Sequence, residues 1–321
     1  MNSTLSPLDS SFISQAPVKD TFAAALVKNV VAVLVWLTLS LTNGTMVHTF
    51  LRHPLFSEDP RYILFISMVV NDAIQLTLLT ALYVVSYVFY KVQASGCCVL
   101  VMCAVLTTRN TPLILAGMAI ERYVAICHAL HYQHICTLRR TLLLLGLVLL
   151  LGAAPPLSDL LITLAVERPD FFLSWIFCDH SLLFRDPRIY YKNCAFDATY
   201  FSFVFLTLVY TYVRIVLAAR AASTDRASAR KARNTVLLHG LQLLLCMLTF
   251  VMPSMQAFLL LLFPGKILEI RYVNFLLVYI IPRFLSPMIY GFRDERFRKY
   301  WSRCFTCSIG KIKTENKRSH Q

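Results

Sequence analysis

Isolated ionisable side chains inside apolar stretches are the residues of this chain that could do chemistry. Asp72, Arg109 and Arg283 lie within such stretches, and the pair Glu121-Arg122 ends another one. At membrane depth such charges are costly, so they usually pair with one another or line a functional cavity. This chemistry is ion pairing and switching, and it makes or breaks no covalent bond.

Motifs of covalent or metal-dependent catalysis are absent from the sequence. It contains no HExxH, no CxxC with zinc spacing, no GxSxG and no phosphate-cradling loop. His128, His131 and His134 recur every three residues, and we interpret them as part of a solvated basic loop and not as a metal site. We therefore expect no enzyme, no bound metal and no cofactor.

Composition places the isolated charges in a membrane. Of the 321 residues, 57% are hydrophobic and 15% are charged, whereas a soluble domain carries about 25% charged residues. The apolar stretches are near or above the ~20 residues that cross a bilayer as a helix, and they are too long and too little alternating for barrel strands. We expect an all-α membrane protein, a seven-transmembrane helix bundle, with spans at 21–51, 62–90, 97–127, 141–165, 191–221, 232–263 and 270–291.

The distribution of charge predicts the orientation. Basic residues collect in alternate connections and in the tail, which indicates that this side is cytoplasmic. An odd number of spans leaves the N-terminus outside, where the sequon at Asn2 could be glycosylated. The net charge of +14 follows this membrane pattern, so we expect no nucleic-acid partner. The predicted regions are an extracellular N-terminus (1–20), the bundle (21–291) and a cytoplasmic tail (292–321) with a short amphipathic eighth helix at 294–303.

Five features give the chain a resemblance to a known family. Three are strings: MAIERYVAICHALHY at 118–132, KARNTVLLH at 231–239 and PRFLSPMIYGFR at 282–293; the others are Asp72 after PRYILFISMVVN in the second span and Thr211-Tyr212 in the fifth. In this order, and at these membrane depths, they resemble the odorant receptors, a branch of the rhodopsin-like G-protein-coupled receptors. The match departs from the family at four of these positions, where Glu121 replaces the usual Asp, Ala129 the usual Pro, Thr211 the usual Ser and Val236 the usual Cys.

The resemblance implies a switch at the inner end of the third span. Arg122 would be held by Glu121 at rest and freed to meet a G protein and Tyr212 in the active state. The alternative interpretation of Arg122 is a basic anchor on the cytoplasmic side. The other residues that the resemblance places in the switch are Tyr123, His239 and Tyr290.

The resemblance also implies partners and a location. They are a small odorant, membrane lipid and a stimulatory olfactory-type heterotrimeric G protein at the plasma membrane. The G protein would dock on the basic second and third inner loops and raise cyclic AMP.

Asp72 and Arg283 are predicted to form a buried ion pair, because the implied fold makes their positions face each other near the middle of the bundle. Many receptors of the wider family bind sodium at that aspartate, and Arg283 would disfavour the ion by repulsion. A pair that only holds two helices together is the alternative, and both roles can coexist.

Arg109 lies about 20 Å above Arg122 along the third span, from a rise of 1.5 Å per residue. Helical projection turns it toward the fourth and fifth spans, where Asp159 or Asp197 could neutralise it. It is either a structural ion pair or a ligand contact, and a contact would favour a carboxylate or another acceptor on the ligand.

Position alone maps the expected ligand pocket. Ala104 stands where amine receptors of the superfamily carry an aspartate, which argues against an amine ligand. An apolar lining with a few hydroxyls suits a small organic molecule, although each residue taken singly could also be core packing. The expected ligand residues are Val105, Thr108, Arg109, Tyr200, Met247, Val251 and Tyr279.

The resemblance also implies roles for four cysteines. Cys97 and Cys178 match the structural disulfide of the superfamily, which the oxidising outer face permits. Cys304 and Cys307 follow the amphipathic segment and are either palmitoylated or free.

The sequence leaves two alternatives to the function of an odorant receptor. A non-olfactory receptor for a peptide, lipid or nucleotide has the same fold, but its branches lack KARNTVLLH. A polytopic transporter would show paired discontinuous helices or an inverted repeat, and we find neither in the sequence.

Overall fold

The computed structural model describes most of the first five predicted spans and part of the seventh. The described residues are 22–89, 91–222, 244, 255, 258–259, 262–263, 267–285, 294 and 296–302. The N-terminal residues, most of the predicted sixth span and the end of the tail lie outside them.

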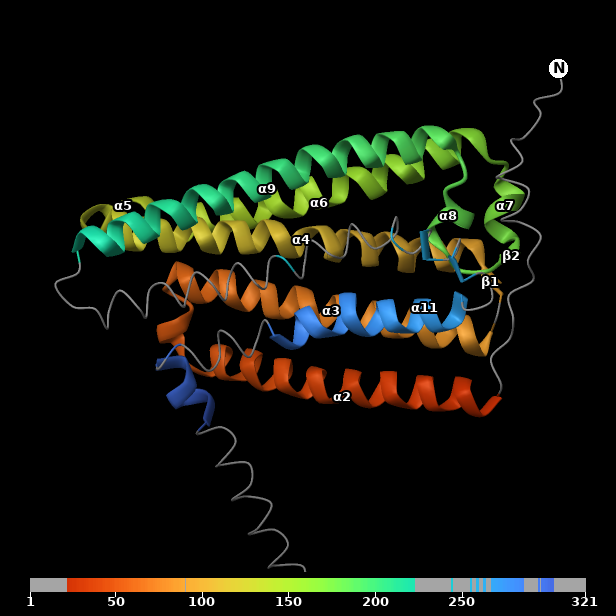
Figure 1. Cartoon of the computed structure of the whole chain (residues 1–321), viewed down its shortest axis with the longest axis horizontal. Helices are drawn as coiled ribbons and strands as arrows, with labels where there is room; N and C mark the ends of the chain where they lie inside the picture. Colours follow the sequence, from red (N-terminus) through yellow and green to blue (C-terminus); the bar gives the residue numbers. More distant parts are fainter. Residues whose placement is uncertain are drawn as a thin grey trace, which may run out of the picture.

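Five long helices run side by side through the described part of the chain (Figure 1). Each is long and apolar enough to cross a membrane. Their ends agree with the predicted spans to within a few residues, because the length of each apolar stretch largely determines where a membrane helix ends. The helices are α2 (Phe22–Arg52), α3 (Pro60–Val88), α4 (Ala94–Cys127), α6 (Leu138–Val166) and α9 (Pro187–Ala222).

The predicted seventh span is described in part. α11 (Ile267–Asn274) continues directly into η4 (Phe275–Ile280), which is a π-helix, and helical residues follow to 285. A π-helix has wider turns than an α-helix, is rare, and often occurs at functional sites.

Local signals in the sequence explain where two of the helices begin. Asp59 caps α3, because its carboxylate accepts a hydrogen bond from the backbone N–H of Arg61 at 3.0 Å and Pro60 follows as the first helical residue. Thr137 caps α6 by accepting from the N–H of Arg140 at 3.4 Å.

α4 is the central helix of the described bundle. It packs against α3, α6 and α9, while α2 packs on α3. Leu115 and Met118 on α4 are almost fully buried, whereas Leu150 on α6 and Leu206 on α9 are mostly exposed. Exposed leucines on helices of this length are expected to face lipid, which is as apolar as they are.

The two ends of the bundle differ (Figure 1). At the end where α2 begins lie α7 (Pro169–Leu173), α8 (His180–Leu183) and a pair of short antiparallel strands, β1 (Val92–Gln93) and β2 (Trp175–Ile176). α5 (Tyr132–Ile135) lies at the opposite end, preceded by η2 (Ala129–His131); η1 (Pro54–Phe56) connects α2 to α3. The predicted outer loop and the first two predicted inner loops therefore lie at opposite ends of the bundle, which we name outer and inner after that prediction.

Residues 296–302 are helical and pack against the inner ends of α2 and α3. The carboxylate of Asp294 accepts from the backbone N–H of Phe297 at 2.9 Å and from the Tyr62 hydroxyl at 3.0 Å. Trp301 donates its indole N–H to Thr45 Oγ1 at 3.0 Å. This segment lies within the predicted eighth helix.

Candidate functional site

Glu121 at the inner end of α4 has two partners. Its Oε2 lies 3.3 Å from Nε of Arg122, and its Oε1 accepts a hydrogen bond from the Tyr132 hydroxyl at 2.9 Å. Glu121 is only 5% exposed, so both contacts compensate a charge that is largely removed from water. Burial, and then the charge of Glu121, raise the pKa of Tyr132, so its hydroxyl stays protonated and able to donate.

Sequence reasoning missed Tyr132 as a partner of Glu121. α5 brings it back to the end of α4, which spacing along the chain does not reveal. The available signal was that Tyr132 ends the same motif that contains Glu121.

The other residues predicted for the switch are only partly placed. Tyr123 contacts His128, with 3.2 Å between its hydroxyl oxygen and Nε2, and packs edge-on against the ring of Tyr210. Tyr212 lies on α9 and is 38% exposed; among the described contacts its hydroxyl does not reach Arg122. His239 and Tyr290 lie outside the described residues.

Asp72 and Arg283 are both buried in the middle of the bundle. They are 1% and 2% exposed. Asp72 Oδ1 accepts from the Thr111 hydroxyl at 3.1 Å, and Arg283 donates from Nε and Nη2 to Gln75 Oε1 at 3.2 and 2.9 Å. Gln75 lies one helical turn after Asp72, so the two charges approach the same face of α3. The predicted ion pair between them stays a prediction.

A layer of buried amides and hydroxyls surrounds these charges. Gln75 Nε2 donates to Thr108 Oγ1 at 2.6 Å, and Asn71 Nδ2 donates to Thr111 Oγ1 at 2.9 Å. Asn110 in turn donates to Asn71 Oδ1 at 3.3 Å. Sequence reasoning named only Thr108 among them, although Gln75 could have been found from its position three residues after Asp72.

Arg109 pairs with Asp197 and not with Asp159. Its Nη2 lies 2.9 Å from Asp197 Oδ1, its guanidinium carbon lies 5.2 Å from the centre of the Phe196 ring, and only 6% of the residue is exposed. Tyr200 donates its hydroxyl to the carbonyl oxygen of Arg109. The prediction of a neutralising carboxylate on the fourth or fifth span is confirmed, and a direct contact between Arg109 and a ligand stays a prediction.

Asp159 has other partners. Its carboxylate accepts from Nζ of Lys192 and, at 3.0 Å, from Nδ2 of Asn193, and it lies 3.7 Å from Nε2 of His180. Two ion pairs therefore join α9 to its neighbours in their outer halves. Asp197 of α9 pairs with α4, and Lys192 of α9 pairs with α6.

The residues of the predicted ligand pocket are described unevenly. Val105 and Thr108 are half-buried, and Tyr200 is buried at the contact of α4 with α9. Met247, Val251 and the side chain of Tyr279 lie outside the described residues.

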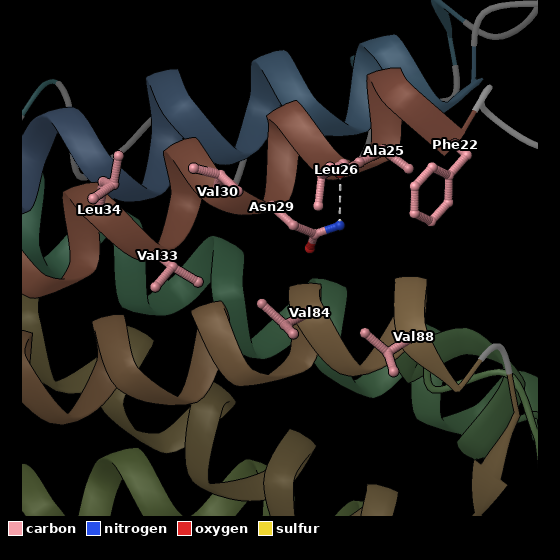
Figure 2. Close-up of a pocket in the computed structure, with 9 residues that line it drawn as sticks. All are labelled: Phe22, Ala25, Leu26, Asn29, Val30, Val33, Leu34, Val84 and Val88. Atoms are coloured by element: carbon pink, nitrogen blue, oxygen red, sulfur yellow. Dashed lines mark hydrogen bonds between the residues drawn. The ribbon is translucent and has the colours of Figure 1, made fainter.

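A groove of about 560 Å³ lies elsewhere, between the outer halves of α2 and α3. Figure 2 shows apolar side chains from both helices around it, with the Asn29 amide donating to the carbonyl of Ala25. Leu26, Leu34 and Val88 line it and are more than half exposed, so we interpret the groove as a lipid-facing surface. It contains none of the predicted ligand residues.

The disulfide between Cys97 and Cys178 is present and confirms the prediction. It joins the outer end of α4 to the loop that carries β2 and α8. Cys98 and Cys194 are free. Cys304 and Cys307, like Asn2, lie outside the described residues. In the part of the chain that the structure describes, no group of three His, Cys, Asp or Glu residues could hold a metal.

α4 thus carries an arginine–glutamate pair at one end and a disulfide at the other. Residues 42–290 match the family described as 7 transmembrane receptor (rhodopsin family). The chain belongs to this family, whose members are multi-pass membrane receptors and not enzymes.

Individual relatives show which branch of the rhodopsin family the chain resembles. The chain is 30% identical to Odorant receptor 131-2 of Danio rerio, over 98% of this chain and 96% of that protein. It is 25% identical to Olfactory receptor 4K15 of Homo sapiens, over 83% and 78% of the two chains, and 27% identical to human Olfactory receptor 52A1, over 61% and 63%. Within the rhodopsin family the chain is thus a member of the odorant receptors.

Proposed function

We propose that this protein is an odorant receptor of the plasma membrane, with its N-terminus outside, that binds a small organic odorant and activates a stimulatory olfactory-type G protein to raise cyclic AMP. The observation that carries the proposal is the course of α4. It begins at the disulfide with Cys178, passes Thr108 and Arg109 in its outer half, and ends at Glu121-Arg122.

The mechanism is a shift of population between two arrangements. The odorant lies in the outer half against Val105, Thr108, Tyr200 and their neighbours and binds the active arrangement more tightly. Arg122 then leaves Glu121 and contacts the G protein, while Tyr212, His239 and Tyr290 rearrange around it. No bond of the chain is made or broken.

A cyclic AMP screen in cells that express the chain tests this function. A chemically diverse odorant panel should contain molecules that raise cyclic AMP in a dose-dependent way, and Arg122→Ala at equal surface level should abolish the response. Ligand uptake without a second messenger would favour a transporter, and a response to peptides or nucleotides alone would favour a non-olfactory receptor.

The orientation has its own test. An N-terminal epitope should bind antibody on intact cells, and removal of N-glycans should increase the electrophoretic mobility of the wild type but not of Asn2→Gln. An epitope that is accessible only after permeabilisation would contradict the proposed orientation.

A further inference from the structure

Gln75 on α3 makes hydrogen bonds to two other predicted spans. It is 0% exposed. Its Oε1 accepts from Nε and Nη2 of Arg283 at 3.2 and 2.9 Å, and its Nε2 donates to Thr108 Oγ1 at 2.6 Å. One amide therefore joins α4 to the helical residues that follow η4.

The hydrogen bonds of Gln75 have a defined direction. A guanidinium group has only donors, so the amide oxygen of Gln75 must face Arg283 and its nitrogen must face Thr108. The Thr108 hydroxyl uses its proton on the carbonyl of Ala104 at 2.8 Å, which leaves its oxygen free to accept from Gln75. The hydrogen bonds from Arg283 through Gln75 and Thr108 to Ala104 therefore all run in the same direction, from donor to acceptor.

The two ends of this hydrogen-bond chain lie at different kinds of site. Thr108 is half-buried and belongs to the expected ligand pocket. Arg283 is buried and lies about one helical turn after the end of the π-helix η4. A buried donor or acceptor that loses its partner costs free energy, so a displacement of Thr108 is unfavourable unless Gln75 and Arg283 move with it.

We propose that Gln75 is the positioning residue that couples occupancy of the outer cavity at Thr108 to the position of the seventh span at Arg283. The inference rests on the proposed function, because it needs an odorant beside Thr108. Gln75 transmits the displacement and does not touch the odorant itself.

Hydrogen exchange of the purified receptor in lipid nanodiscs tests the coupling without any ligand. Thr108→Val removes the acceptor of Gln75 and should raise amide exchange in residues 275–285 about fivefold, the size expected for one buried hydrogen bond. Gln75→Met has a similar length but neither an acceptor for Arg283 nor an N–H for Thr108, and it offers the Thr108 hydroxyl no strong acceptor. In the Gln75→Met background, Thr108→Val should therefore leave exchange at 275–285 at the level of the Gln75→Met single variant.

Thr80→Val is the matched control. It removes the same hydroxyl from a buried position on α3, and Thr80 is 5% exposed with a hydroxyl that has no hydrogen-bond partner among the described residues. Its exchange at 275–285 should equal that of the wild type. Wild-type exchange in Thr108→Val, or an equal further increase in the Gln75→Met background, would overturn the inference.

Signalling separates this inference from the proposed function. With an odorant found in the cyclic AMP screen, Gln75→Met at equal surface level should lower the maximal response, and Thr80→Val should not. If no molecule of the panel raises cyclic AMP, the proposed function fails, while the exchange measurement still decides whether Gln75 couples Thr108 to the seventh span.

Discussion

The guanidinium of Arg109 and the carboxylate of Asp197 lie 2.9 Å apart between the outer halves of α4 and α9. Arg109 is the more deeply buried partner, with 7% of its side chain exposed against 29% for Asp197. Tyr200, one of the residues predicted to contact the ligand, donates its hydroxyl to the backbone carbonyl of Arg109. Its charges compensate each other in a region where an unpaired charge is expensive.

Removal of Arg109 alone should be more harmful than removal of the whole pair. Arg109→Leu leaves Asp197 without its cation and should cost about 3 kcal/mol, the low end for a broken buried pair because Asp197 is partly exposed. The double variant Arg109→Leu/Asp197→Leu should recover most of that loss in thermal unfolding of the receptor in nanodiscs. Additive losses would show that the two residues are independent. If the double variant loses its response to carboxylate odorants alone, Arg109 also contacts the ligand.

Asp72 and Arg283 should show coupling in a double-mutant cycle. We expect Arg283→Met and Asp72→Asn each to reduce surface delivery and signalling, and the double variant to be less impaired than the sum of the two. The coupling energy between residues in one buried network is about 0.5–3 kcal/mol. Additive losses would contradict the predicted ion pair.

Tyr132→Phe should raise basal signalling. The variant removes the hydroxyl that donates to Glu121, so the resting position of Glu121 loses a hydrogen bond to a charged group, worth about 1.5–3 kcal/mol. Basal cyclic AMP per receptor at the surface measures the effect, and Tyr191→Phe at an exposed position is the control. Unchanged basal signalling in Tyr132→Phe would mean that this hydrogen bond does not restrain the resting state.

The disulfide should be required for delivery to the surface. It joins residues 81 positions apart, and the loss of a bridge across so long a loop costs about 3–5 kcal/mol. Cys178→Ser should therefore show strongly reduced surface staining. Cys98→Ser is the matched control, because Cys98 is buried next to Cys97 and is free. Equal surface levels of the two variants would contradict a structural role for the bridge.

Features that depend on residues near one another in the sequence were predictable. The long apolar stretches placed the five described membrane helices to within a few residues, because a helix needs a minimum apolar length to cross a bilayer. Glu121 and Arg122 are adjacent, so their contact required no knowledge of the fold. The Cys97–Cys178 bridge joins residues 81 positions apart, and only the resemblance to the receptor superfamily indicated it.

Contacts between helices were decided by the tertiary structure. Helical projection left both Asp159 and Asp197 as partners of Arg109, and only the rotation of α9 against α4 selected Asp197. The positions of Gln75 near Asp72 and of Tyr132 at the end of the Glu121 motif did not identify their partners, since each acquires its role from a residue on another element. Periodicity determines which residues share a face of one helix, whereas the distance between side chains on two helices depends on how those helices cross and rotate.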